Sequence, residues 1–285
     1  MILVVGGTGR LGRQLVTDLL ARGDKVRVLT RDGSRADEPG AEVVIGDLRD
    51  PASLGRAVAG CTAVVSAAHG LLGGRGAGPE QVDRDGTVNL VRAAVEAGVE
   101  HLVLVSMHGA SPDHPMELSR MKYAAEEAVR GSGIGHTILR PPAYYETWID
   151  ILGAKLDSGG PVMIFGRGRN PISFVSVVDV ARAVSTALDD PQLRGQTVDV
   201  GAAENLTMIR FAERLVEHAG GGSRIRHLPL PVLRAMSGLA RPVAPAFARM
   251  ARSAVAMDTG DMAMAPGRVE PFPDITWRRL AEVLG

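Results

Sequence analysis

The chain has 285 residues, 45% of them hydrophobic, and its 32 basic residues balance its 32 acidic ones. This length fits one large domain or one domain with a smaller annex, and the neutral balance argues against a general attraction to nucleic acid or to a membrane. The single Cys61 cannot form an intramolecular disulfide, and no apolar run approaches the ~20 residues that span a bilayer. We therefore expect a cytoplasmic monomer or homodimer that acts on a small molecule.

The first predicted element is an apolar strand, Met1 to Val5, that runs into a glycine-rich loop. Apolar residues recur at helical spacing from Leu11 to Leu20, so a helix is predicted directly after the loop. A strand, a glycine loop and a helix N-terminus bring backbone N–H groups against a pyrophosphate. An ordinary tight turn is the alternative, but the flanking pattern favours a dinucleotide site formed by Gly6, Thr8, Gly9, Arg10, Leu11 and Gly12.

The first 140 residues alternate β-branched runs with amphipathic helical stretches, which indicates an α/β fold. Strands are predicted at Ile2 to Val5, Lys25 to Thr30, Glu42 to Ile45, Ala63 to Ser66, Leu102 to Ser106 and His136 to Leu139. Helices are predicted near Leu11 to Ala21, Pro51 to Ala59, Gln81 to Ala97 and Met116 to Arg130. This rhythm predicts a Rossmann-type doubly wound parallel sheet.

The pattern changes after Arg140-Pro141-Pro142, which predicts a second region. We expect residues 1–143 to form a dinucleotide-binding domain, to which residues 172–202 return. Residues 144–171 and 203–285 are expected to form a small, mostly helical substrate-binding region. The arginine-bearing stretch Val232 to Met257 could lie on a membrane surface, but Pro242 and Pro245 interrupt it, so a helical layer that caps the substrate pocket is favoured.

The end of the second predicted strand, Val28 to Arg31, indicates which dinucleotide is bound. Dinucleotide-binding folds that hold NAD usually carry an acidic residue here that binds the adenosine ribose. Arg31 can instead stack on adenine and pair with a 2′-phosphate, so NADP(H) is the predicted cofactor. Arg10 and Arg35 are expected to complete a phosphate clamp. In the alternative, Asp32 binds the ribose and Arg31 is a solvated turn residue.

Two further strand ends carry residues suited to the same cofactor. Asp47 and Leu48 follow the third strand, where the Asp47 carboxylate can accept a hydrogen bond from the adenine amino group. In the alternative, Asp47 caps the helix that begins at Pro51. Ala67 and Ala68 follow the fourth strand, and their small side chains let the backbone approach a ribose.

Several separated segments resemble the short-chain dehydrogenase/reductase superfamily in its extended and atypical branches. They are residues 6–12 (GGTGRLG), 46–48 (GDL), 82–90 (VDRDGTVNL), 138–142 (ILRPP) and 174–181 (FVSVVDVA). The likeness is greatest to the NmrA-like group. It implies an NADPH-dependent reductase of quinones, imines or enones, or a member that binds the cofactor without catalysis. The resemblance also places Pro142 beside the nicotinamide.

In that superfamily the reaction centre is a Tyr-x-x-x-Lys pair with a serine at the end of the fifth strand. The tyrosine transfers the proton, while the lysine lowers its pKa and holds the nicotinamide ribose. Ser106 and Lys122 match two of these positions, but Leu118 stands where the tyrosine is expected. Leucine cannot exchange a proton, so the usual mechanism is not available there. Because the chain has only three lysines, a cofactor role for Lys122 is favoured over an exposed helix lysine.

Other groups could supply the proton. Tyr144 and Tyr145 directly follow the segment that the resemblance places at the nicotinamide, so either could reach a substrate. The proton is expected to come from Lys122, Tyr144 or water. Core packing is the other interpretation of both tyrosines. Glu126 lies one helical turn after Lys122 and could pair with it, although a surface salt bridge is favoured. Three loop histidines could act as acids or simply occupy turns: His69, His108 and His114.

The predicted function is an atypical NADPH-dependent reductase that passes hydride to a small carbonyl, quinone, imine or enone. Ser106 would polarise the acceptor and Lys122 would position the ribose. The alternative is a sensor or assembly protein that binds NADP(H) and performs no chemistry, which Leu118 motivates. Epimerase or lyase chemistry needs the missing tyrosine and is least favoured. No metal site is predicted, because no His-Glu-x-x-His or paired-cysteine spacing occurs.

Overall fold

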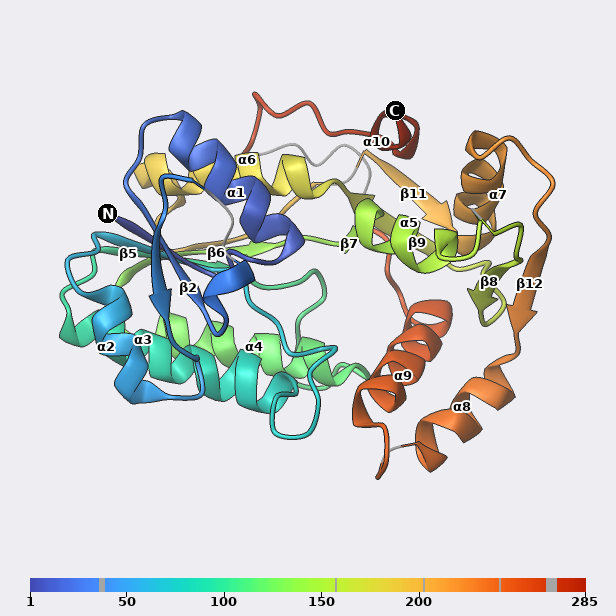
Figure 1. Cartoon of the computed structure of the whole chain (residues 1–285), viewed down its shortest axis with the longest axis horizontal. Coiled ribbons are helices and arrows are strands. Elements are labelled where there is room, and N and C mark those ends of the chain that lie inside the picture. The colour runs from blue at the N-terminus through green and yellow to red at the C-terminus, as the bar shows by residue number, and fades with distance from the viewer. Residues whose placement is uncertain (36–38, 157, 202, 241, 265–270) are drawn as a thin grey trace. The chain divides into compact units, whose positions relative to one another are not determined.

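The computed structural model describes residues 1–35, 39–156, 158–201, 203–240, 242–264 and 271–285, with the backbone alone at Arg35. The chain forms two compact units (Figure 1). The first comprises Met1–Pro141 and Val180–Val200, and the second comprises Pro142–Asp179 and Gly201–Gly285. Each unit has its own hydrophobic core.

The first unit is built on a seven-stranded sheet in which every pairing is parallel. The strand order is β10-β6-β5-β4-β1-β2-β3. The strands are β1 (Ile2–Val5), β2 (Val26–Thr30), β3 (Glu42–Ile45), β4 (Ala63–Ser66), β5 (His101–Val105), β6 (Gly135–Arg140) and β10 (Gln196–Asp199). The predicted doubly wound parallel sheet is confirmed.

Helices cover both faces of this sheet. They are α1 (Arg10–Ala21), α2 (Pro51–Val58), α3 (Gly86–Glu96), α4 (Glu117–Arg130) and α6 (Val177–Asp189), with the short turns η1 (Gly33–Arg35), η2 (Glu80–Asp85) and η3 (Pro191–Leu193). Figure 1 shows α1 and α6 on one face and α2, α3 and α4 on the other. Because both faces are covered, the inward and outward side chains of the central strands are apolar alike, and Leu3, Val4, Val64 and Val65 are fully buried.

The predicted helix from Gln81 to Ala97 begins as a π-helical turn, η2, and becomes α-helical at Gly86. A Cβ at Gly86 would lie 2.8 Å from the Cβ of Leu48, so the chain passes very close to the segment after β3 at this point. The π turn holds Asp83 in the interior with 1% of its surface exposed. Such turns are frequent at functional sites.

The second unit combines two small sheets with helices. One sheet has the order β11-β9-β7, and the other pairs β12 with β8. The strands are β7 (Ala143–Tyr144), β8 (Val162–Phe165), β9 (Pro171–Val175), β11 (Glu204–Thr207) and β12 (Ile225–Leu228), and the helices are α5 (Tyr145–Gly153), α7 (Met208–His218), α8 (Leu230–Leu239), α9 (Pro245–Thr259) and α10 (Leu280–Leu284). Tyr145, Phe174 and Phe211 pack together in its core, with ring centroids between 5.0 and 6.1 Å apart.

The return to the large sheet starts later than the sequence predicts. Residues 172–202 are expected to return, but β9 pairs with β7 and β11 in the second unit, and the first unit resumes at Val180 within α6. The apolar pattern of a short strand does not name its partner, because strand preference depends on tertiary context. The predicted helical stretch Val232 to Met257 is divided into α8 and α9, with Pro242 in the break.

His101, at the start of β5, makes the stability of the first unit depend on pH. Its surface is 3% exposed, and its Nε2 lies 3.1 Å from Thr137 Oγ1. Burial, with a smaller contribution from the charge of Arg194, lowers the pKa of His101 to about 4. An unfolded histidine titrates near ~6.5. The unfolded chain therefore binds more protons between the two values, so stability falls as the pH is lowered through this window.

We expect the wild-type protein to lose about 3 kcal/mol more stability between pH 7.5 and pH 4 than the His101→Gln variant loses. Urea unfolding at a series of pH values measures this difference. His218→Gln, at an exposed position in the last turn of α7, is the control and should keep the wild-type pH dependence. Identical pH dependence of the wild type and His101→Gln would contradict the prediction.

Candidate functional site

The strand order creates a switch point between β1 and β4. The chain leaves β1 towards β2 and β3 on one side and then returns to β4 on the other. Ligands of open α/β sheets bind at the carboxyl ends of the strands at such a point. Gly6 follows β1, and a Cβ on it would lie 2.8 Å from Ala68 N and 2.9 Å from the carbonyl carbon of Ala67. The first predicted glycine and the two predicted alanines therefore lie side by side.

The loop after β1 folds tightly onto the N-terminus of α1. Gly9 N donates to Gly6 O at 2.9 Å, and a Cβ at Gly12 would lie 2.1 Å from the same carbonyl oxygen. Helix α1 has no side-chain cap, and Arg13 N donates to Gly9 O at 2.8 Å. The N–H groups before Arg13 have no acceptor within the helix. Together with the helix dipole, they suit an anionic pyrophosphate.

The other predicted residues of this loop contribute in different ways. Leu11 is 7% exposed and packs in the core, so it would meet a phosphate through its backbone N–H. Leu48, after β3, has the same exposure and would likewise use its backbone. Thr8 O accepts a hydrogen bond from Arg13 Nε at 3.1 Å, which fastens the loop to α1. Arg10 is exposed at the first position of α1.

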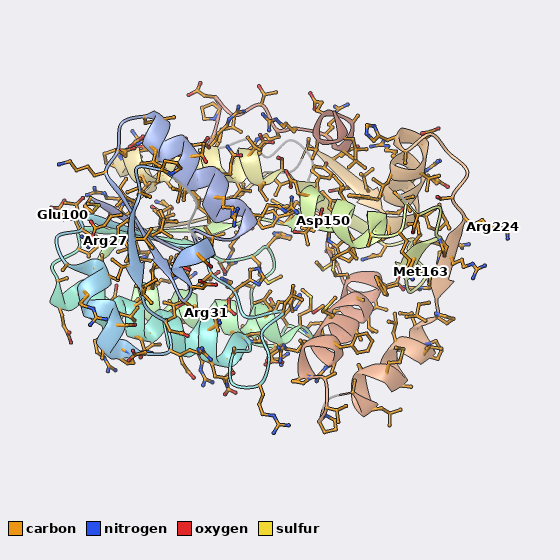
Figure 2. All side chains as sticks on the ribbon, viewed as in Figure 1. Arg27, Arg31, Glu100, Asp150, Met163 and Arg224 are labelled. Atoms are coloured by element: carbon orange, nitrogen blue, oxygen red, sulfur yellow. The ribbon has the colours of Figure 1, made fainter. Side chains whose placement is uncertain are left out.

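Arg31 lies at the carboxyl end of β2 with an exposed side chain (Figure 2). Asp32, the alternative ribose-binding residue, uses its carboxylate in a local turn. It accepts hydrogen bonds from Ser34 N at 3.0 Å and from Ser34 Oγ at 2.7 Å. This arrangement favours Arg31 as the residue that meets the adenosine end of a cofactor. The side chain of Arg35 lies outside the described residues.

Asp47, after β3, is held by Arg49. Arg49 Nε lies 3.0 and 3.1 Å from the two carboxylate oxygens of Asp47. This hydrogen bonding, with a smaller contribution from the charge of Arg31, lowers the pKa of Asp47. Asp50 caps helix α2 by accepting from Ala52 N at 3.1 Å, so the interpretation of Asp47 as that cap is wrong. An adenine amino group would share the Asp47 carboxylate with Arg49.

Lys122 lies on α4 with 5% of its surface exposed. Its Nζ donates to Ala68 O at 2.9 Å and to Val105 O at 3.0 Å, and Asp83 Oδ1 lies 3.0 Å away as an ion pair. Two of the three N–H donors of the ammonium therefore go to carbonyl oxygens, and the Asp83 carboxylate balances its charge. These contacts also tie α4 to the ends of β4 and β5. Lys122 thus reaches the alanine that packs against Gly6.

Sequence reasoning missed Asp83 as a site residue. Asp83 Oδ2 accepts from Gly70 N at 2.8 Å, so the same carboxylate holds both Lys122 and the loop after β4. The signal was present in the segment 82–90, but an aspartate on a helical stretch usually faces solvent. His69 lies in that loop directly after Ala68. Its side chain is exposed.

Ser106, directly after β5, donates its hydroxyl proton to Glu126 at 2.5 Å. Glu126 is fully buried and also accepts from Arg140 Nε at 2.8 Å and from Arg130 Nη2 at 2.8 Å. The expectation that Glu126 forms a surface salt bridge is wrong, and so is its possible pairing with Lys122. Because a carboxylate can only accept hydrogen bonds, the Ser106 proton is not available to polarise a substrate carbonyl.

The two tyrosines after Pro142 belong to the second unit. Tyr145 is fully buried, stacks on Phe174 with ring centroids 5.5 Å apart, and donates to Glu204 at 3.3 Å. Tyr145 is therefore a core residue. Tyr144 lies on β7, and burial, reinforced by the charge of Glu146, raises its pKa. The Tyr144 hydroxyl therefore stays protonated at neutral pH and can donate a hydrogen bond.

The loop histidines are held by other groups. His108 Nδ1 lies 3.0 Å from Asp199 Oδ1, and His114 Nδ1 accepts from Met116 N at 3.1 Å, just before α4. His114 thus serves a turn, as its simpler interpretation holds. Pro142 is the first residue of the second unit and is partly buried.

The first unit brings most of the predicted residues to one edge of its sheet. The glycine loop, Ala67, Ala68 and Lys122 meet at the ends of β1 and β4, while Arg31 and Asp47 follow β2 and β3. Such an edge suits an extended dinucleotide, with the pyrophosphate at α1 and the adenosine towards β2 and β3. Leu118, on α4, offers no transferable proton.

Among the described residues, no group of three or more His, Cys, Asp or Glu side chains is placed to hold a metal ion. The helices in this part of the chain are all too short or too polar to cross a membrane. Cys61 is buried, and burial raises the pKa of its thiol.

Known proteins with similar sequences include a reductase and an assembly factor. The (4-alkanoyl-5-oxo-2,5-dihydrofuran-3-yl)methyl phosphate reductase of Streptomyces griseus is 31% identical over 256 residues, which cover 88% of this chain and 86% of that protein. The photosystem II assembly factor Ycf39 of Trieres chinensis is 28% identical over 83% of this chain and 74% of its own.

A solved structure and a family model also match this chain. The NADPH-dependent quinone oxidoreductase QOR2 of Escherichia coli, complexed with NADPH, matches with a TM-score of 0.81 and 21% identity, over 100% of this chain and 98% of that one. This likeness shows the same fold. The family described as NAD(P)H-binding matches residues 6–191. The chain therefore belongs to the NAD(P)H-binding family, an atypical branch of the short-chain dehydrogenase/reductase superfamily.

Proposed function

We propose that this protein is an NADPH-dependent reductase that transfers hydride to a small quinone, enone, imine or carbonyl compound without a catalytic tyrosine. The observation that carries the proposal is the meeting of Gly6, Ala68 and Lys122 at the switch point, beside the uncapped N-terminus of α1. The bound cofactor would supply the hydride. The reductases among the relatives and similar folds support this class of reaction.

The other steps of the proposed reaction are binding of the cofactor and supply of a proton, and they fall to different groups. Lys122 contributes a fixed positive charge next to Ala68, on the ribose side of the cofactor. Ser106 is given no part in polarising the acceptor, because its hydroxyl proton goes to Glu126. The proton needed after hydride transfer comes from Tyr144 or from water. Quinones and other conjugated acceptors suit such a site best, because their reduced anions are stable enough to take a proton from water.

Arg31 is the residue on which the preference for NADPH rests. We expect Arg31→Asp to weaken NADPH binding by about 10-fold or more and NADH binding by less than about 3-fold, because an aspartate repels the 2′-phosphate. Titration of cofactor fluorescence measures both affinities. Arg56→Asp, at an exposed position on α2, is the matched charge reversal and should leave both affinities unchanged. Equal losses for the two cofactors with Arg31→Asp would contradict the preference.

The reaction is tested by following NADPH absorbance with purified protein and a panel of acceptors. The panel contains benzoquinones, cyclic enones, cyclic imines and simple ketones. We expect turnover with quinones or enones to exceed turnover with simple ketones by about 10-fold or more, because simple ketones need a well-placed proton donor. Tyr144→Phe should slow any ketone reduction more than quinone reduction. Absence of turnover with every acceptor would contradict the proposed reaction.

The second candidate is a protein that binds NADP(H) as a ligand for assembly or sensing. Leu118 in place of the tyrosine favours it, and so do the contacts that hold Lys122 to Ala68 O, Val105 O and Asp83. The similarity to the photosystem II assembly factor Ycf39 adds to this candidate. Tight NADPH binding without turnover across the acceptor panel is the result that would select it over the reductase.

A further inference from the structure

Asp83 and Lys122 form an ion pair deep inside the first unit. The two side chains are 0% and 7% exposed, and Lys122 Nζ lies 3.0 Å from Asp83 Oδ1. Taking an ammonium out of water costs several kcal/mol unless a counter-charge and hydrogen bonds replace the water. Asp83 supplies the counter-charge, while Ala68 O and Val105 O supply the hydrogen bonds. The π turn η2 is what brings Asp83 to this position.

The two oxygens of the Asp83 carboxylate face different partners. Oδ2 accepts a hydrogen bond from Gly70 N at 2.8 Å. Oδ1 has no hydrogen-bond partner in the part of the chain that the structure describes, so its interaction with Lys122 is one of charge rather than of a directed hydrogen bond. Neutralising either member of the pair would leave the other charged group buried without compensation.

We propose that Asp83 is a positioning residue that keeps Lys122 as a fixed ammonium at the ends of β4 and β5, so that Lys122 acts on the cofactor through its charge and does not donate the proton. This inference rests on the proposed function. A proton lost from Lys122 would turn it into an amine that cannot satisfy two carbonyl oxygens and the Asp83 carboxylate at once. The three acceptors around Nζ therefore all stabilise the ammonium.

The other charged groups that the structure describes near Lys122 do not balance the charge of its ammonium, so Asp83 has that role. His69, from the loop after β4, has an exposed side chain, so solvent screens any charge that it carries. On α4 itself, the Glu126 carboxylate is compensated by Arg130 and Arg140. The other charged residues of η2 pair with one another near the surface: Glu80, Arg84 and Asp85.

The test is the pH dependence of NADPH binding, measured by cofactor fluorescence between pH 6.5 and pH 9.5. Asp83→Asn keeps an oxygen for Gly70 N but removes the charge. We expect it to weaken NADPH binding by about 10-fold at the alkaline end and by less than about 3-fold at pH 6.5, because a buried ammonium without its counter-charge is disfavoured against the neutral amine as the pH rises. Asp83→Glu keeps the charge and should restore most of the alkaline affinity. In a Lys122→Met background, Asp83→Asn should change the affinity by less than about 2-fold.

Each other outcome overturns the inference. Asp83→Asn could instead weaken NADPH binding equally at every pH, with an effect that adds to the effect of Lys122→Met. That result would show that Asp83 acts through the Gly70 loop. If Asp83→Asn does not fold, the inference is tested with Asp83→Glu and Lys122→Met instead. NADPH binding by Lys122→Met at the wild-type affinity would also overturn the inference. A wild-type protein that binds no NADPH at any pH would contradict the proposed function itself, whereas a binding wild type with an independent Asp83 contradicts this inference alone.

Discussion

Gly12→Ala is expected to abolish NADPH binding, with a loss of affinity of about 100-fold or more, and to cost about 3 kcal/mol of stability. An added Cβ would lie 2.1 Å from Gly6 O and 2.6 Å from Gly7 Cα. Both contacts are with backbone atoms, so no side-chain rotation relieves them. The loop and the start of α1 must move apart, and the N–H groups that would hold the pyrophosphate then point elsewhere.

Gly55→Ala is the matched control for this prediction. Gly55 lies within α2, and a Cβ there meets no atom within 4 Å. Alanine should therefore stabilise the helix by up to ~1 kcal/mol and leave cofactor binding unchanged. Urea unfolding and fluorescence titration of both variants give the two quantities. If Gly12→Ala bound NADPH within a few-fold of the wild type, the loop after β1 would not be the pyrophosphate site.

Glu126→Ala should lower the free energy of unfolding by about 3 to 5 kcal/mol. The Glu126 carboxylate is fully buried and lies 2.6 Å from Arg140 Nη2 and 2.8 Å from Arg130 Nη2. Its removal leaves the Arg140 guanidinium, which is 22% exposed, without its partner. Arg130 is 33% exposed and can turn to solvent, which favours the lower end of the range. Ser106 also loses the acceptor of its proton.

Glu127→Ala, one position further along α4, is the control. Glu127 also pairs with Arg130, but its side chain is 54% exposed. Exposed pairs contribute at most ~1 kcal/mol, so Glu127→Ala should change the free energy of unfolding by less than that. Unfolding in urea measures both variants under the same conditions. Similar costs for the two substitutions would show that burial of Glu126 does not decide its contribution.

The local features of the first unit were accessible from the sequence because they depend on neighbouring residues. The apolar run Met1 to Val5 and the glycines after it predict β1 and the turn into α1, and the structure has both. Because glycine has no Cβ, a run of glycines indicates a tight turn or a close approach of the backbone, and this signal depends only on the residues of the run. The alternation of strands and helices predicted the doubly wound sheet for the same reason, since connections in such folds follow few rules.

The partners of charged residues were not accessible in this way. The spacing of Glu126 and Lys122 on one helix suggested that they pair with each other, yet Glu126 binds Ser106 and Arg140, and Lys122 binds Asp83. Each of these partners comes from a different element of the fold. Helical spacing shows which residues can meet on one helix, whereas the parallel sheet decides which other elements lie against it.

The sequence by itself therefore determined the fold class, the glycine-rich turn after β1 and the absence of a tyrosine at Leu118. The turn and Leu118 are encoded within a few consecutive residues, and the fold class follows from the order of the predicted strands and helices. The tertiary structure alone decided that Asp83 holds Lys122, that Glu126 takes the proton of Ser106, and that β9 lies in the second unit. These outcomes depend on burial and on contacts between distant segments. A buried charge takes as its partner the group that the fold places beside it, and no local pattern specifies that group.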